Sequence, residues 1–337
     1  MPLMPLSSSP ISRRDQIARV QQTLLQWYAT EKRDLPWRTT SDPYAILVSE
    51  MMLQQTQVDR VLPKYRQFLS TFPTLADLAA ASTADVISVW VPLGYNMRAV
   101  RLQGIARQVI AEHQGRIPDT IETLLTLKGV GRYTAGAIAC FAYHKQVATV
   151  DTNIRRVLHR LFFGLEYPEP KLNDAQMLVF AEEVLPEGEA YNWNQALMDL
   201  GATICTSNNP QCDRCPLHEQ CQAYAEMSQQ SLFPSGTVFR QLRKVAEKKS
   251  EYQASKGNQT TQATQPFTSS NRYYRGRIVD LLRQLPTQQR ISLNILGPRI
   301  KADFAEHDLP WLEKIVRGLE RDGLVDIKEN GVRLPSS

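Results

Sequence analysis

Apolar residues recur every three or four positions along the first two thirds of the chain, the spacing that gathers them on one face of an α-helix. Few stretches alternate strictly between apolar and polar residues, as a half-buried strand would. This part of the chain is therefore predicted to be mainly α. The predicted helices cover residues 15–28, 45–57, 61–68, 75–81, 84–90, 98–113, 155–163, 175–184 and 193–203.

The pattern changes after residue 225. Residues 226–271 are rich in Lys, Gln, Ser and Thr, which predicts a flexible basic linker. Three short helices and a hairpin then predict a small winged-helix-like module over residues 272–335. The third of these helices mixes acidic and basic residues, which is more typical of a solvated or protein-contacting face than of a DNA-contacting one. The helical spacing covers residues 276–285, 293–303 and 311–322, and the hairpin turns at Asn330-Gly331.

Two glycines one residue apart, Gly129 and Gly131, separate two helical patterns and predict a tight hairpin. Glycine tolerates a positive φ and lets the backbone approach a partner closely. The N–H groups of Gly129, Val130 and Gly131 are expected to point outward without partners, beside the free N–H groups of the next helix. Such a cluster would bind an anion, and we expect a nucleic-acid phosphate. The alternative is an ordinary corner between two helices.

Two carboxylates stand out. Glu50 lies within the apolar pattern of residues 45–57, which follows a predicted helix cap at Asp42 with Pro43 in the first turn. It is either a solvent-facing helix position or a buried functional group. Asp151 stands just ahead of the helix at residues 155–163, where a helix N-terminus favours negative charge.

Four of the five cysteines fall in one segment, spaced Cys205-x6-Cys212-x2-Cys215-x5-Cys221. Four thiolates so close in sequence can enclose one tetrahedral zinc ion or a cubane iron–sulfur cluster. This clustering is typical of a metal site in a reducing compartment and less so of a secreted disulfide framework. The fifth cysteine, Cys140, lies in an apolar run and is predicted to be a buried core thiol.

Composition narrows the class of protein. The chain has 337 residues, a hydrophobic fraction of 42%, a net charge of +5 and a pI near 8.9. The length allows two domains, and the positive charge fits a nucleic-acid partner. With no apolar run of about eighteen residues and no hydrophobic N-terminal stretch, we expect no membrane span and no signal peptide. The expectation is a monomeric cytoplasmic protein, associated with the nucleoid if the source is prokaryotic.

Several motifs resemble a known family. LKGVGRYTAGAIACFA and VDTNIRRVLHRLF resemble the helix-hairpin-helix DNA glycosylase superfamily, whose signature is a phosphate-gripping hairpin followed by an active-site Asp. LPWR, DPYAILVSEMMLQQTQV and NQALMDLGATIC are similar to its adenine-specific mismatch glycosylases (MutY type), which remove adenine paired opposite 8-oxoguanine or guanine. The resemblance covers roughly residues 24–225. It implies a two-lobed helix-hairpin-helix glycosylase fold with a [4Fe–4S] cluster loop at residues 205–221.

The resemblance also implies roles for individual residues. Glu50 matches the catalytic acid, Asp151 matches the active-site Asp, and Tyr95 matches a tyrosine that intercalates between bases. The implied partner is double-stranded DNA containing a mispaired adenine. The other implied DNA-contacting residues are Gln54, Gln55, Thr56, Arg38, Gly129, Val130, Gly131 and Asn153, and the implied cluster ligands are Cys205, Cys212, Cys215 and Cys221.

The chemistry explains why two carboxylates are needed. The enzyme must first extrude its target base from the duplex. The glycosidic bond then breaks through an oxocarbenium-like state, in which a carboxylic acid helps the base to leave and an ionised carboxylate stabilises the sugar cation. The apolar helix around Glu50 suits the acid because desolvation favours the protonated form. Asp151 suits the stabilising carboxylate.

Tyr133 discriminates among members of the superfamily. Members that cut the strand carry a lysine at this position, because an amine can form a Schiff base with the sugar. A phenol cannot, so we expect a monofunctional glycosylase with Tyr133 among its catalytic residues. Tyrosine also occurs there in a relative that removes thymine from T·G mismatches, which is the alternative activity, although Gln54-Gln55-Thr56 favours adenine. A non-catalytic DNA-binding iron–sulfur protein, the second alternative, would require the loss of Glu50 or Asp151.

Three features depart from the family pattern. Thr152 replaces the usual Gly after the active-site Asp, and Asn96 replaces a second Tyr after Tyr95. Full-length members also carry a C-terminal Nudix-like domain with a Phe-Ser-His loop that senses 8-oxoguanine. The C-terminal region here has no such motif and is expected to be too short and too helical for that fold. We therefore expect residues 11–225 to form the glycosylase domain, with a smaller preference for A·8-oxoG over A·G than full-length relatives have.

Overall fold

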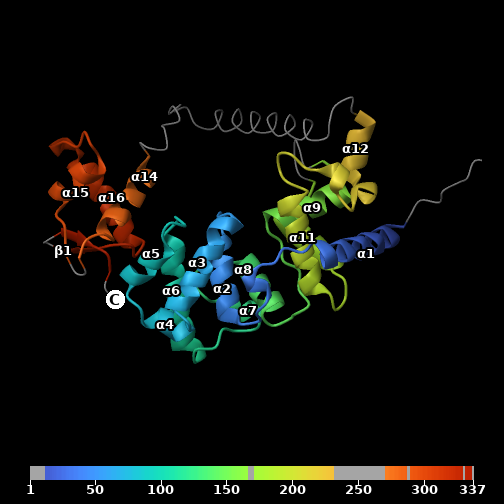
Figure 1. Cartoon of the computed structure of the whole chain (residues 1–337), viewed down its shortest axis with the longest axis horizontal. Helices are drawn as coiled ribbons and strands as arrows, with labels where there is room; N and C mark the ends of the chain where they lie inside the picture. Colours follow the sequence, from blue (N-terminus) through green and yellow to red (C-terminus); the bar gives the residue numbers. More distant parts are fainter. Residues whose placement is uncertain (1–11, 166–170, 231–269, 287–288, 329–330, 336–337) are drawn as a thin grey trace, which may run out of the picture. The chain divides into compact units, whose positions relative to one another are not determined.

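The computed structural model describes residues 12–165, 171–230, 270–286, 289–328 and 331–335 (Figure 1). Contacts divide the chain into unit 1, formed by Met1–Leu35 and Gly136–Thr260, and unit 2, formed by Pro36–Ala135 and Thr261–Ser337. Each unit therefore combines two separate stretches of the chain. Most of the predicted linker lies at residues 231–269, outside the described residues. In the described ranges, no helix has both the length and the apolar character needed to cross a membrane.

Unit 2 contains a helical body with α2 buried inside it. Every residue of α2 from Tyr44 to Met52 is buried, and the helix packs against α3 and α6. Asp42 caps its N-terminus by accepting hydrogen bonds from the backbone N–H groups of Tyr44 and Ala45, with Pro43 in the first turn as predicted. The body comprises η1 (Pro36–Arg38), α2 (Pro43–Leu53), α3 (Val58–Thr71), α4 (Leu75–Ala80), α5 (Thr83–Trp90), α6 (Met97–His113), α7 (Ile121–Leu124) and the start of α8 (Arg132–Phe141).

The C-terminal elements of unit 2 form their own apolar core, which continues onto the body. Ile87 of α5 is fully buried in that core, and Met97 and Val100 of α6 pack against it. The backbone N–H of Ala84 also donates to the carbonyl of Pro335. The elements are α14 (Asn271–Leu282), α15 (Leu293–Ile300), η5 (Glu306–Asp308), α16 (Leu309–Arg321), β1 (Asp326–Lys328) and β2 (Gly331–Arg333), with β1 and β2 antiparallel.

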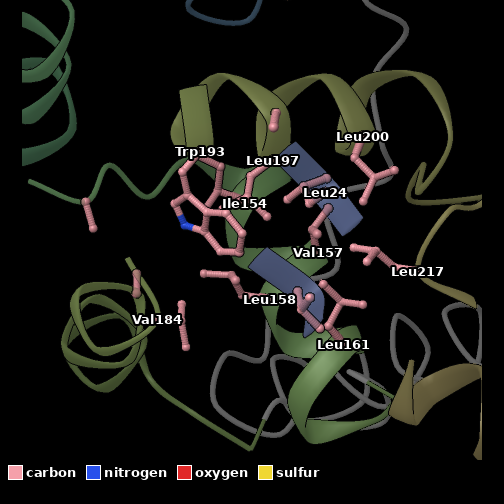
Figure 2. Close-up of a cluster of buried hydrophobic side chains, with 14 of the residues drawn as sticks. Leu24, Ile154, Val157, Leu158, Leu161, Val184, Trp193, Leu197, Leu200 and Leu217 are labelled. Carbon is pink, nitrogen blue, oxygen red and sulfur yellow. The ribbon is translucent and has the colours of Figure 1, made fainter. Parts of the chain in front are cut away.

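Unit 1 is held together by a second apolar core. Figure 2 shows Trp193, Leu197 and Leu200 of α11 gathered with side chains from α1 and α9. Leu24 of α1 and Val157 of α9 are both fully buried there. The elements of this unit are α1 (Arg13–Glu31), the end of α8, α9 (Thr152–Phe163), α10 (Asp174–Glu183), α11 (Ala190–Thr203), η2 (Cys212–Arg214), η3 (His218–Gln220) and α12 (Gln222–Gln230).

The mainly helical prediction is confirmed, with several boundaries corrected. The helix predicted over residues 45–57 ends at Leu53, because Gln54 leaves the helical conformation at ψ 111° and Gln55 follows at a positive φ of 56°. The C-terminal helix predicted to begin at residue 276 begins earlier, at Asn271, where the Ser270 side chain accepts from the N–H of Tyr273. The helix predicted to reach residue 303 ends at Ile300. Both strands of the predicted hairpin are present. Of the predicted turn Asn330-Gly331, Asn330 lies outside the described residues and Gly331 is the first residue of β2.

Candidate functional site

Glu50 is buried within unit 2, at 6% exposure. It is the only charged residue of α2, and its neighbours Ser49 and Met51 are both 1% exposed. The solvent-facing alternative for Glu50 is therefore wrong. Burying a carboxyl group favours its neutral form or requires compensating partners. The fold thus buries one ionisable group within an otherwise uncharged helix.

A polar turn, Gln54–Thr56, follows α2 directly. Gln55 is exposed at its tip, while Gln54 and Thr56 are half-buried. The backbone N–H of Thr56 donates to the carbonyl of Leu53 across the turn. Gln55 lies in the left-handed region at φ 56°, which is uncommon for a residue with a side chain and clusters at functional sites. The side chain expected to enter DNA is thus presented to solvent by a constrained backbone.

Tyr95 is presented by a second turn of unit 2. Its side chain is 44% exposed, and its φ is 50°, directly after Gly94 at φ 75°. The exposed aromatic predicted at this turn is therefore present. Arg272 of α14 lies over the ring, with its Cζ 4.3 Å from the ring centroid. The C-terminal element that contacts this turn is thus α14, the first helix of the module. From the sequence alone, only the third helix, α16, was considered for contact with DNA.

The predicted hairpin connects the short helix α7 to α8. Gly129 adopts φ 106°, and a Cβ added there would lie 3.5 Å from the Cβ of Arg101. The expectation that all three hairpin N–H groups lack partners is wrong, because the N–H of Val130 donates to the carbonyl of Leu127 at 3.0 Å. Among the described residues, no acceptor is recorded for the N–H groups of Gly129 and Gly131, and both glycines are exposed. Two donors, not three, thus remain for an anion.

Two further predicted residues of unit 2 lie at element boundaries. Tyr133 is the second residue of α8 and is half-buried. Arg38 ends η1 and is also half-buried, beside the buried Trp37. Both side chains are therefore partly open to solvent.

Asp151 is the N-cap of α9 in unit 1. Its side chain accepts from the backbone N–H of Ile154 at 2.7 Å and from Nδ2 of Asn153 at 2.9 Å. The two hydrogen bonds hold the carboxyl group at the N-terminus of α9. Arg156 donates to Oδ1 of Asn153 and to the carbonyl of Gly201. Asn153, which donates to Asp151, is thus held by Arg156, and Arg156 is itself hydrogen-bonded to α11.

The four clustered cysteines line one cavity of unit 1. Burial is the largest cause that raises the pKa of Cys212 to about 11 and those of Cys215 and Cys221 to about 12, and the neighbouring thiols raise all three further. Within the described residues, no three His, Cys, Asp or Glu side chains surround a position for a single metal ion.

The cysteine cavity also has a buried cation and an apolar lining. Arg160 lines it at 1% exposure, and its Nη1 lies 3.6 Å from Sγ of Cys205. Its guanidinium also donates to the carbonyls of Thr206 and Ser207. Leu161 and Leu200 contribute apolar surface to the lining. The fifth cysteine, Cys140, is fully buried as predicted, near Nδ2 of Asn194.

Sequence reasoning missed Arg98. This residue lies in the first turn of α6, is 5% exposed, and donates hydrogen bonds to both the Gln54–Thr56 turn and the turn of Tyr95. Burial lowers its pKa to about 10. A signal for it was available, because a cation in the first turn of a helix opposes the helix dipole and needs another reason to be there.

The chain is similar to DNA repair glycosylases both in sequence and in structure. The HhH-GPD superfamily of base excision DNA repair proteins matches residues 48–182. The solved structure of a thermostable thymine-DNA glycosylase resembles this chain with a TM-score of 0.59 and 33% sequence identity, over 64% of this chain and 99% of the glycosylase chain. The buried acid, the hairpin and the capping aspartate therefore belong to a helix-hairpin-helix DNA glycosylase fold.

Two relatives narrow the class further. The adenine DNA glycosylase of Mycolicibacterium smegmatis is 36% identical over 310 residues, covering 91% of this chain and 93% of its own. The human adenine DNA glycosylase is 42% identical over 232 residues, which are 66% of this chain and 42% of the human protein. The chain belongs to the adenine DNA glycosylase family.

Proposed function

We propose that this protein is a base excision repair enzyme that flips adenine out of double-stranded DNA and cleaves its N-glycosidic bond. The observation that carries the proposal is the 36% identity to an adenine DNA glycosylase over nine tenths of both chains. The adenine is mispaired with 8-oxoguanine or guanine. The similarity to a thymine-DNA glycosylase keeps thymine opposite guanine as the second candidate.

In this proposal the two carboxylates divide the chemistry. Glu50 donates a proton to the departing adenine, because its buried position in α2 disfavours the charged form. Asp151, held by its two hydrogen-bond donors, stabilises the positive charge that develops on the sugar, and a water molecule then adds to the sugar carbon and loses a proton. Tyr133 offers no amine for a Schiff base, so the sugar–phosphate strand is left uncut.

In this proposal, DNA is bound by the hairpin before α8, by the Gln54–Thr56 turn and by Tyr95. The N–H groups of Gly129 and Gly131 bind a backbone phosphate next to the start of α8. Gln54, Gln55 and Thr56 enter the duplex beside the mismatch, and Tyr95 intercalates. Arg38 and Asn153 also contact the DNA. The catalytic domain extends to the end of α12 at Gln230, and residues 271–335 form a winged-helix-like module joined to it by residues 231–270.

Cys205, Cys212, Cys215 and Cys221 hold a [4Fe–4S] cluster in this proposal. All four line a single cavity, and four thiolates can enclose a cubane iron–sulfur cluster. Arg160 places a buried guanidinium beside Cys205, where it can offset the negative charge of cluster thiolates. The group would supply structural cross-linking of residues 205–221, and no step of base removal passes through it.

A base-release assay on three duplexes tests the proposal. Duplexes carrying A·8-oxoG, A·G and T·G are incubated with excess protein, and the abasic product is cleaved with alkali. We expect product from the two adenine duplexes and none from T·G. Product from T·G alone would replace the proposed activity with the thymine one.

A further inference from the structure

Arg98 forms hydrogen bonds to the end of α2, to the Gln54–Thr56 turn and to the turn of Tyr95, which have separate roles in the proposed function. Its Nη1 donates to the backbone carbonyls of Met51 at 3.2 Å and Met52 at 2.9 Å, and also to that of Gln54. These carbonyls end α2, the helix that carries Glu50. Arg98 lies on α6, so the guanidinium caps a helix more than forty residues away in the sequence.

The same guanidinium holds the two turns that are proposed to enter DNA. Its Nη2 donates to Oγ1 of Thr56 at 3.0 Å and to the carbonyl of Gly94 at 3.2 Å. Its Cζ also lies 5.2 Å from the centroid of the Tyr95 ring. One planar group with fixed donor directions therefore sets the distance between the Gln54–Thr56 turn and Tyr95.

Two further observations separate this arrangement from an ordinary helix cap. Arg98 is 5% exposed, and its buried guanidinium donates to the backbone carbonyls of Met51, Met52 and Gly94. Both turns also contain a non-glycine residue at positive φ, Gln55 at 56° and Tyr95 at 50°. Such conformations persist only where surrounding contacts hold them, and they occur at functional sites.

We propose that Arg98 is a positioning residue that joins the Gln54–Thr56 turn and Tyr95 into one rigid reading unit. The two turns then enter the duplex together, at a spacing that only a correctly mispaired site accommodates. The inference rests on the proposed function for the roles of Gln55 and Tyr95. It goes beyond that function, which assigns roles to Gln55 and Tyr95 but does not say what fixes the distance between their two turns.

Arg98→Lys is the test variant, because lysine keeps the charge but cannot direct two separate donor groups to the two turns. Arg107→Lys is the matched control: Arg107 lies on the same helix and donates to the carbonyls of Ala79 and Ala81, away from both turns. Single-turnover base release at saturating DNA should fall roughly ten- to a hundredfold for Arg98→Lys, as expected for reacting groups displaced by about 1 Å. Arg107→Lys should release base at the wild-type rate, and thermal denaturation shows whether each variant is folded.

A double-mutant cycle measures the coupling between Gln55 and Tyr95. Gln55→Ala and Tyr95→Ala are combined in the wild-type and in the Arg98→Lys backgrounds. In the wild-type background, the falls in base-release rate caused by Gln55→Ala and Tyr95→Ala should be strongly non-additive, because the two turns act as a unit. In the Arg98→Lys background, each substitution should lower the rate by the same factor whether or not the other is present. Equal coupling in both backgrounds would overturn the inference. If Arg98→Lys does not fold, Thr56→Val replaces it in the cycle, because it removes one acceptor of the guanidinium and leaves the arginine in place.

A second readout separates this inference from the proposed activity. Duplexes with 2-aminopurine beside the mismatch brighten when an inserted side chain unstacks it, whether or not a base is released. If the wild-type protein releases no adenine but the brightening shows coupling that Arg98→Lys removes, the proposed activity fails and the inference stands. If adenine is released and neither the rate nor the brightening responds to Arg98→Lys, the proposed activity stands and the inference fails.

Discussion

Arg272, the second residue of α14, lies over the ring of Tyr95, with 4.3 Å between its Cζ and the ring centroid. A guanidinium over an aromatic face is stabilising by about 0.5–1 kcal/mol at an exposed site. The contact brings a basic residue of the C-terminal module to the turn that is proposed to intercalate. It therefore predicts that this end of α14 takes part in DNA binding.

Salt dependence of DNA binding tests the role of Arg272. Each phosphate contact contributes roughly one to the slope of log affinity against log salt concentration. Arg272→Ala should therefore weaken binding and reduce that slope by about one. Arg321→Ala removes the same charge from an exposed position on α16 and should leave the slope unchanged. Equal slopes for both variants would contradict a specific contribution from α14.

Gly201→Ala should disturb the neighbour of Asp151. A Cβ at Gly201 would lie 2.7 Å from the Cβ of Asn153 and 3.3 Å from its backbone, so α11 and the start of α9 would have to move apart. Overpacking of this kind costs about 1–3 kcal/mol in the free energy of unfolding. Denaturant titration should show that loss, and base release should slow because Asn153 donates to Asp151.

Gly104→Ala is the control for this substitution. Gly104 lies within α6, and an added Cβ there would meet nothing within 4 Å. Alanine is favoured over glycine inside a helix by about 1 kcal/mol, so this variant should be slightly more stable and equally active. A loss of stability at Gly104 equal to that at Gly201 would show that contact with Asn153 is not the cause.

The cysteine cavity predicts the metal content of the purified protein. We expect about four irons per chain and the brown colour of a cubane cluster. Cys212→Ser should lower both the iron content and the soluble yield, because a cluster ligand is lost. Cys140→Ala changes the cysteine outside the cavity and should keep the iron. A colourless, fully active protein with one zinc ion would contradict the cluster.

Tyr133 predicts weak strand cleavage. Borohydride should trap little wild-type protein on abasic product, because no amine occupies this position. Tyr133→Lys should raise the trapped fraction, whereas Arg132→Lys, which places an amine at the adjacent exposed position, should not. Efficient trapping by the wild type would indicate another amine, such as Lys128 or Lys145.

Local features of the fold were predictable from the sequence because neighbouring residues determine them. The cap at Asp42, the apolar helix around Glu50 and the exposed turn at Tyr95 follow from spacing and turn chemistry. The role of Arg98 was not predictable in this way, because its acceptors at Met51 and Thr56 are separated from it by forty-seven and forty-two residues. Periodicity shows that a residue is buried, and it does not show which distant groups it meets.

The hairpin and the end of α2 show a second limit. The spacing of Gly129 and Gly131 indicated a turn correctly, but not that the N–H of Val130 would be used by the carbonyl of Leu127. The pattern of α2 likewise continued past Leu53, although the non-helical backbone of Gln54 and the left-handed backbone of Gln55 exclude both residues from the helix. Backbone conformation at a non-glycine residue depends on the contacts around it, and a single sequence does not contain those contacts.

Glu50 is proposed to supply the proton for base departure, so Glu50→Gln removes the acid on which base release depends. The amide keeps the shape of the side chain and removes the acid, so single-turnover adenine release from an A·8-oxoG duplex should fall by at least about a hundredfold. Affinity for the same duplex should stay near the wild-type value, and Glu187→Gln, the same change at an exposed loop position, should alter neither quantity. Adenine release by Glu50→Gln at a rate close to that of the wild type would contradict the account.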